Sequence, residues 1–129
     1  MAEISRRTTL ARVRFLGSAK DGTAHWWAQR LTAAALVPLA LWFVAGMVIL
    51  TGSGHGQFVA WLGRPVPAVL MLLLIVATFH HAQLGLQVVI EDYVHQPGLR
   101  IALLVLVKFA AFGLGLAAGF AVLKIAFGG

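Results

Sequence analysis

Residues 65–93 read PVPAVLMLLLIVATFHHAQLGLQVVIEDY, and this stretch decides the fold. Prolines at its start suit the first turn of a helix, and no acidic, lysine or arginine residue follows until Glu91. A run of about 20 apolar residues is long enough to cross the hydrocarbon core of a bilayer as a helix. The stretch therefore predicts a membrane-spanning helix that carries two adjacent histidines, His80 and His81, in its interior.

Two more apolar stretches flank this helix and predict spans at residues 26–50 and 99–127, beside the span at 66–93. Pro38 lies inside the first of them and is expected to bend it, because proline removes a helix hydrogen bond. We therefore predict an all-α integral membrane protein whose 129 residues form a single membrane-anchor domain with three transmembrane helices.

Two smaller features belong to this arrangement. Residues 58–62, between the first two spans, are expected at the membrane interface with Trp61 at the depth of the lipid headgroups. In the third span, Ala111, Gly115 and Gly119 recur every four residues, and such a stripe of small residues lets a neighbouring helix approach closely. We interpret the stripe as ordinary packing within the bundle.

The composition excludes several classes of protein. Apolar residue types make up 60% of the chain and charged types 11%, and the mean hydropathy is +0.91. Soluble domains are about half apolar and a quarter charged, so a soluble enzyme would expose much of this apolar surface to water. The chain contains no cysteine, which rules out disulfides, thiolate metal sites and iron–sulfur ligation by its own residues.

The positive charge is concentrated at the start of the chain. Six of the ten Lys and Arg residues lie within the first thirty residues, and the net charge of the whole chain is +6. Cytoplasmic segments beside membrane spans are rich in Lys and Arg, so the basic tail at residues 1–25 is expected in the cytoplasm. A tail that binds nucleic acid is the weaker interpretation, because a hydrophobic span follows at once. We expect a multi-pass protein of the bacterial inner membrane, with the mitochondrial inner membrane as the alternative location.

His81 lies near the middle of the predicted span, about 22 Å along the helix from Val66. An ionisable residue inside a membrane span is costly and usually functional. In one interpretation the ring simply bonds a neighbouring carbonyl or Thr78. In the other interpretation, His81 is a haem ligand. The two interpretations are comparably supported in an apolar bundle without other metal ligands.

Helix geometry favours His81 over His80 as the ligand. Residues four positions apart lie one above the other on a helix face, and His81 has the small residues Ala77 and Gly85 at those positions. The corresponding neighbours of His80 are larger, and its side chain points about 100° away from that of His81. A flat macrocycle needs small neighbours around its ligand, and a six-coordinate haem would need its second ligand from another subunit.

Two carboxylates and a tyrosine end the span at Glu91-Asp92-Tyr93. Carboxylates at a helix C-terminus oppose the helix dipole, which hints at a functional role beyond solvation. Asp92 follows His81 by eleven residues and falls within about 20° of the same helix face. Tyr93 is either an interfacial anchor or a phenol that donates a hydrogen bond to a bound headgroup.

Arg30 marks the inner end of the first span, just after His25-Trp26-Trp27. It belongs either to a basic and aromatic belt or to an anion site for groups such as haem propionates, because Arg pairs well with carboxylates. Lys108 lies roughly 12 Å along the third span from Arg100, and no pattern explains it.

A resemblance to a known family rests on the second span. His81-Ala82-Gln83-Leu84-Gly85, then Gln87-Val88 and Asp92-Tyr93-Val94, resembles the H-A-x-x-G…Q-V…D-Y-V signature of the hydrophobic membrane anchor subunit of succinate dehydrogenase. The approach to the first span, Gly22…His25…Arg30, is similar to the family with a looser spacing. The resemblance implies a helical bundle shared with a second, cytochrome b556-type anchor subunit, and together the two hold an iron–sulfur subunit and a flavoprotein subunit at the membrane.

The resemblance also implies roles for single residues. By it, His81 is an axial ligand of the iron of haem b, and the second anchor subunit gives the other histidine. Tyr93 hydrogen-bonds ubiquinone, Asp92 lies near the proton path, and Arg30 and His25 lie near the haem propionates. The implied function is to help bind haem b and ubiquinone and to pass electrons from the iron–sulfur subunit to quinone. Succinate is oxidised on another subunit, so this chain is a non-catalytic part of the enzyme.

His80 and Lys108 fall outside the family's pattern, and three other functions stay open. A fumarate reductase anchor is closely related and differs in the direction of electron flow. A non-redox scaffold or assembly protein with three spans would use both histidines for packing. A small transporter subunit would use His81 as a proton relay.

Overall fold

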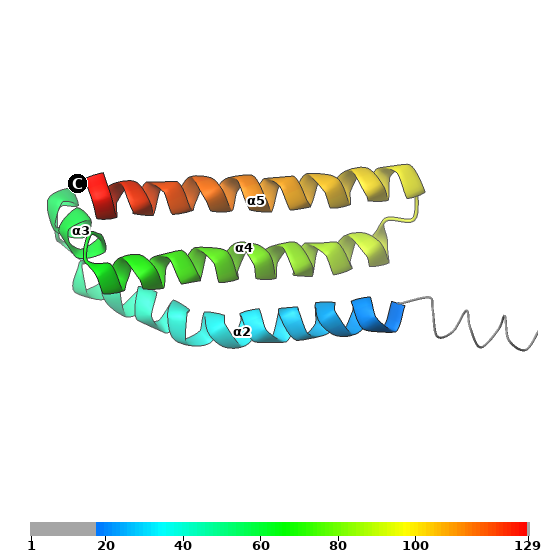
Figure 1. Ribbon diagram of the computed structural model, residues 1–129, viewed down its shortest axis with the longest axis horizontal. Helices are drawn as coiled ribbons and strands as arrows, with labels where there is room; N and C mark the ends of the chain where they lie inside the picture. The colour runs from blue at the N-terminus through cyan, green and yellow to red at the C-terminus, as the bar shows by residue number, and fades with distance from the viewer. Residues whose placement is uncertain (1–17, 129) are drawn as a thin grey trace, which may run out of the picture.

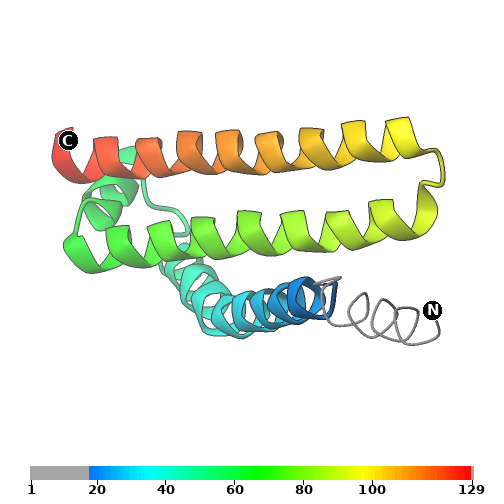
Figure 2. The ribbon, with the colours of Figure 1, turned by 45° about the vertical axis from the view of Figure 1, so that its right-hand side comes forward.

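The computed structural model of the chain describes residues 18–128, and its helices are α2 (Ser18–Ile49), α3 (His55–Leu62), α4 (Pro65–Tyr93) and α5 (Pro97–Gly128). Figures 1 and 2 show three long helices side by side, with α4 in the middle and the short α3 at one end. Helix α4 packs along both α2 and α5, whereas the backbones of α2 and α5 do not approach each other closely within the described residues. The middle helix is therefore the one whose two sides meet different neighbours.

All three long helices are long and apolar enough to cross a membrane, over Gly22–Ile49, Pro65–Tyr93 and Pro97–Gly128. The predicted all-α membrane fold with three spans is confirmed. Helix α2 begins before residue 26, where the sequence placed the end of a polar tail. An extended helix carries its unpaired terminal N–H groups out of the apolar layer, which explains the earlier start. Residues 1–17 of that tail lie outside the described part of the chain.

Helix α2 turns along its length. Pro38 lies inside it, and Figure 1 shows the helix axis changing direction in its cyan part, as the proline predicts. The chain then reverses through a turn at Gly52, whose φ of +83° suits a residue without a Cβ.

Residues 58–62 fold into the second half of α3, which packs against the end of α2. The ring of Trp61 stacks on that of Trp42, with 5.5 Å between centroids and 21° between planes. Gly46 permits this approach, because a Cβ at that position would lie 2.9 Å from the Trp61 ring. Trp61 therefore joins the packing at this end of the bundle.

The hydrophobic core lies at the same end. Leu62, Ala68, Met71 and Val122 form a buried cluster contributed by α3, α4 and α5. Most large apolar side chains elsewhere on the three long helices are exposed in the isolated chain, as expected for helices that face lipid or a partner. The opposite end, where α4 ends in Glu91-Asp92-Tyr93, is held mainly by α4 packing against its two neighbours.

Candidate functional site

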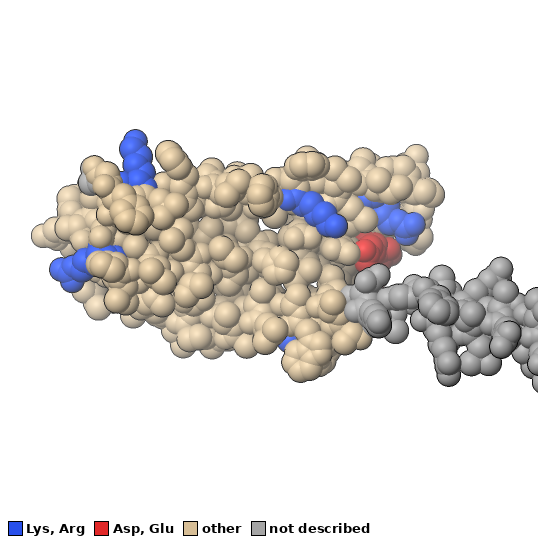
Figure 3. Space-filling model, viewed as in Figure 1, with Lys and Arg blue, Asp and Glu red and all other residues tan. Residues whose placement is uncertain are grey.

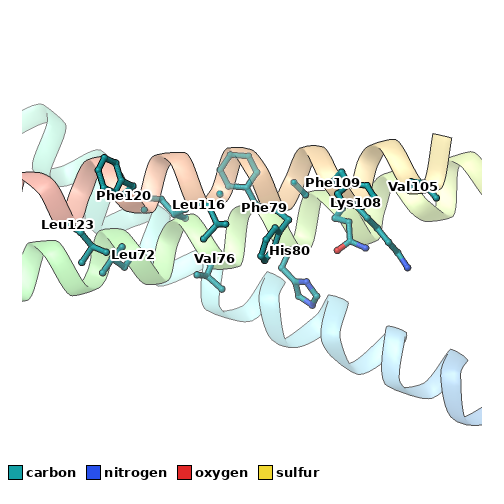
Figure 4. A pocket seen from close by; sticks show the side chains of 16 residues that line it. Leu72, Val76, Phe79, His80, Val105, Lys108, Phe109, Leu116, Phe120 and Leu123 are labelled. Carbon is teal, nitrogen blue, oxygen red and sulfur yellow. The ribbon is translucent and has the colours of Figure 1, made fainter. Parts of the chain in front are cut away.

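The two adjacent histidines of α4 face different neighbours. His81 is half-buried and meets α2, where its Nδ1 lies 3.0 Å from the Oγ1 of Thr32. His80 is exposed and lines an open groove between α4 and α5 (Figure 4). The predicted divergence of about 100° thus sends one ring into a helix contact and leaves the other in a groove.

Thr32 determines which atom of His81 carries the proton. The Thr32 hydroxyl donates to the carbonyl of Ala28 at 2.7 Å and lies 3.0 Å from the carbonyl of Gln29. A hydroxyl has a single proton, and helical threonines commonly direct it to the carbonyls three and four residues back. The lone pair of Oγ1 is then free to accept the Nδ1–H of His81. Of the two neutral tautomers, the geometry therefore favours the one with its proton on Nδ1 and a lone pair on Nε2.

The Nε2 of His81 is open to a ligand. It has no hydrogen-bond partner among the described residues and is not among their buried unpaired atoms. Beside it, a Cβ added to Gly85 would meet nothing within 4 Å. Ala77, the other small neighbour, is only 7% exposed because it is packed within the bundle. The open surface next to His81 therefore extends towards Gly85 and not towards Ala77, where the sequence also placed it.

The donor set indicates the kind of metal centre that could form. No cluster of three or more His, Asp or Glu side chains able to hold a metal occurs in residues 18–128. A neutral imidazole whose Nδ1–H is hydrogen-bonded is a common metal ligand. His81 thus fits a metal whose remaining ligands come with a macrocycle and from another subunit, as in a haem.

The C-terminal end of α4 presents two polar groups without a hydrogen-bond partner among the described residues. Tyr93 is 79% exposed and Asp92 is exposed, and neither has a hydrogen-bond partner among the described residues. Glu91 differs, because its carboxylate accepts a hydrogen bond of 2.9 Å from the Nε2 of Gln87. The acidic side chains form the red patch at this end of the molecule in Figure 3. The phenol and one carboxylate are therefore available to a ligand.

The two predicted site residues of α2 lie on different sides of that helix. His25 precedes Thr32 by seven residues, which places it on nearly the same face, about 10.5 Å along the helix. Its Nε2 is buried and has no hydrogen-bond partner. Arg30 is exposed, and its guanidinium carbon lies 4.3 Å from the centre of the Trp26 ring. His25 therefore shares a face of α2 with Thr32, the partner of His81, whereas Arg30 stacks on an aromatic ring.

Thr32 is the site residue that the sequence did not reveal. The expected hydroxyl partner of His81 was Thr78, which is exposed on α4 and makes no such bond. Thr32 lies 49 residues away in the chain, and only the pairing of α2 with α4 brings it to the ring. Its sequence signal is weak, being a hydroxyl residue in an apolar run on the face that carries His25.

The groove between α4 and α5, which we name the α4–α5 groove, has a volume of about 1110 Å³. His80, Gln83 and Lys108 are its polar lining residues, and apolar side chains make up the rest (Figure 4). The structure thus brings together the two residues that the family pattern left unplaced. They lie on the side of α4 that faces away from Thr32.

The sequence of the chain is similar to those of a known family of membrane subunits. Residues 4–115 match the family described as succinate dehydrogenase/fumarate reductase transmembrane subunit. Over 102 residues the chain is 36% identical to the succinate dehydrogenase hydrophobic membrane anchor subunit of Rickettsia bellii, covering 79% of this chain and 82% of the relative. The protein of the same name from Paracoccus denitrificans is 32% identical over 113 residues, 88% of this chain and 87% of its own length.

A further relative comes from Reclinomonas americana. That succinate dehydrogenase membrane anchor subunit is 30% identical over 95 residues, covering 71% of this chain and 79% of its own. No solved structure matches the chain significantly.

Proposed function

The chain belongs to the succinate dehydrogenase/fumarate reductase transmembrane subunit family, and from this premise we propose that it helps bind haem b and ubiquinone in succinate:ubiquinone oxidoreductase. Its relatives are named as membrane anchor subunits, so the chain is a non-catalytic, multi-pass membrane subunit of that enzyme. In the proposal, a second anchor subunit, an iron–sulfur subunit and a flavoprotein subunit are its partners. Succinate is then oxidised outside this chain.

The observation that carries the haem proposal is the state of the His81 ring. Its Nδ1 is engaged by Thr32, its Nε2 has no hydrogen-bond partner among the described residues, and a Cβ added to Gly85, one turn along the helix, would meet nothing within 4 Å. His81 would hold the iron through Nε2, and a histidine of the second anchor subunit would complete the coordination. When bound, such a haem would supply a one-electron carrier.

Two side chains of α2 are candidates for binding the haem propionates. A buried polar atom without a partner is unfavourable, and the Nε2 of His25 is such an atom. A carboxylate of the ligand would give it a partner on the face that also carries Thr32. Arg30 would reach a propionate from the neighbouring side of α2, with its stem held against Trp26.

The quinone proposal rests on the inner end of α4. Reduction of ubiquinone takes up two electrons and two protons. Tyr93 would donate its phenol hydrogen bond to a quinone carbonyl, and Asp92, with water, would deliver protons from the same side. The electrons must come from a partner's iron–sulfur centres, because this chain has no cysteine.

The expected orientation places this end of the bundle in the cytoplasm of a bacterium. Arg30 and Arg100 lie near it and add to the basic residues before α2, whereas Arg64 and Lys124 lie near the other end. Cytoplasmic ends are enriched in Lys and Arg, which supports a cytoplasmic N-terminus in the bacterial inner membrane. A reporter domain fused to the C-terminus would then be periplasmic.

The haem proposal is tested by the reduced-minus-oxidised spectrum of the purified complex. His81→Ala should remove the b-type band from an assembled complex, because no other ring on this face of α4 can replace the ligand. His80→Ala is the matched control and should keep the band, since that ring lies in the α4–α5 groove. Full haem content in assembled His81→Ala complex would overturn the assignment.

The same spectrum separates the alternatives. A non-redox scaffold or a transporter subunit would give no b-type band in the wild-type complex. A fumarate reductase anchor would give the band, and the relatives favour succinate oxidation because they are named for succinate dehydrogenase.

A further inference from the structure

We propose that Thr32 is the positioning residue of the haem ligand and sets the tautomer and the ring orientation of His81. The inference rests on the proposed function, since it assumes that His81 binds the iron. Thr32 itself would not touch the haem. It acts through one hydrogen bond that joins α2 to α4.

The first step is the proton count at Oγ1. Three polar atoms surround this oxygen, namely the carbonyls of Ala28 and Gln29 and the Nδ1 of His81. The single hydroxyl proton goes to the carbonyls, where the shorter distance of 2.7 Å lies. Nδ1 must then be the donor to Oγ1. The opposite tautomer would place two lone pairs against each other and would direct an N–H at the metal.

The second step is the rigidity of the acceptor. A β-branched side chain in a helix has few rotamers, and the bond to Ala28 selects among them. Thr32 is also half-buried against α4. The hydroxyl is therefore held in place before any ligand binds, and it leaves His81 little freedom to rotate about its χ2 bond.

The third step is the consequence for a bound metal. A hydrogen bond from the distal N–H of a metal-bound imidazole raises the basicity of the ligand, and losing such a partner typically lowers metal affinity about 10–100-fold. A more basic ligand stabilises the more highly charged, oxidised iron. Removing the Thr32 hydroxyl should therefore weaken haem retention and move the midpoint potential in the positive direction.

The test uses Thr32→Val in the full complex, with haem per complex and midpoint potential as the measurements. Valine keeps the shape of threonine and removes the hydrogen-bond acceptor, so we expect loss of haem on dilution and a more positive potential. Thr32→Ser keeps the acceptor and should restore both properties. Thr78→Val removes an exposed hydroxyl one turn from His81 and should leave both unchanged. Wild-type haem retention and potential in Thr32→Val would overturn the inference.

A purely structural role for Thr32 predicts different behaviour. If the bond only joins α2 to α4, Thr32→Val should lower the thermal stability of the complex and leave the midpoint potential of the haem at its wild-type value, which would also overturn the inference. If the bond acts on the ligand, the midpoint potential should move in the positive direction even in complexes that keep their thermal stability. Haem retained by His81→Ala would instead refute the proposed function, so the two failures are distinguishable.

Discussion

The adjacent histidines His80 and His81 lie on two sides of α4, and their surroundings differ. On the side of α2, His81 is half-buried and its Nδ1 is bonded to Thr32. On the side of α5, His80 is exposed in the α4–α5 groove beside Lys108, and no described residue hydrogen-bonds it. A single step of 100° along the helix separates a hydrogen-bonded ring from a ring without a hydrogen-bond partner among the described residues.

The difference shows that the neighbouring helix, and not the residue type, determines whether one nitrogen of a histidine ring is engaged, and this is the state that we propose for the haem ligand. Each ring has a nitrogen without a hydrogen-bond partner among the described residues, but only His81 has its other nitrogen in a hydrogen bond. On the other side, Gly115 and Gly119 of α5 do face α4, with Phe79 and Leu72 at ordinary contact distances from the Cβ positions. The small-residue stripe thus packs against α4, as expected, and it also lines the α4–α5 groove.

Blocking the open surface beside His81 should have the largest effect. We expect Gly85→Leu to lower the haem content of the complex by more than about tenfold, because the loss of a ligand site is worth several kcal/mol. The chain itself leaves room for the leucine, since a Cβ at Gly85 meets nothing within 4 Å. Haem content is measured from the pyridine haemochrome spectrum of the assembled complex.

The matched control for this substitution lies on the other side of the bundle. Gly115→Ala adds a Cβ at 3.6 Å from Phe79, an ordinary contact, and should leave the haem content unchanged. If Gly85→Leu retained its haem, the surface next to His81 would not be the cofactor face, and the contrast between the two sides would lose its functional meaning.

Removing the Tyr93 hydroxyl should have an intermediate effect and should spare the haem. Tyr93→Phe deletes one hydrogen bond to a quinone carbonyl, which corresponds to roughly tenfold in kcat/KM for quinone reduction. Glu91→Gln is the control at the same helix end, because that carboxylate is already engaged by Gln87. Unchanged quinone reduction in Tyr93→Phe would remove Tyr93 from the quinone site.

Much of the fold could be predicted from the sequence, because hydropathy and helix period are local properties. The three long helices and the divergence of His80 from His81 follow directly from them. Contacts between helices are not local. The hydrogen bond between His81 and Thr32 joins residues 49 positions apart, and the burial of Ala77 depends on how the neighbouring helices pack against α4.

The residues of the candidate site also divide into those that local sequence properties predict and those that depend on packing between helices. Asp92 and Tyr93 were predictable as an exposed pair at a helix end, and the structure leaves them exposed. The unpaired Nε2 of His25 and the stacking of Arg30 on Trp26 were not, since both depend on side-chain packing. No pattern along the chain could place Lys108 beside His80, because they belong to different helices.

The smallest effect is expected from a substitution at Lys108. This substitution tests whether the side of α4 that faces α5 influences the haem. Lys108 is exposed along a membrane span, where an ammonium group is unfavourable by about 2.5–3.5 kcal/mol at the bilayer centre, and by less where the side chain reaches the interface. Lys108→Met keeps the length of the side chain and removes the charge. The haem content and midpoint potential should stay unchanged, and the thermal stability of the complex should be equal or slightly higher. A shifted midpoint potential would mean that the charge in the α4–α5 groove acts on the iron, and the two sides of α4 would then form one electrostatic site.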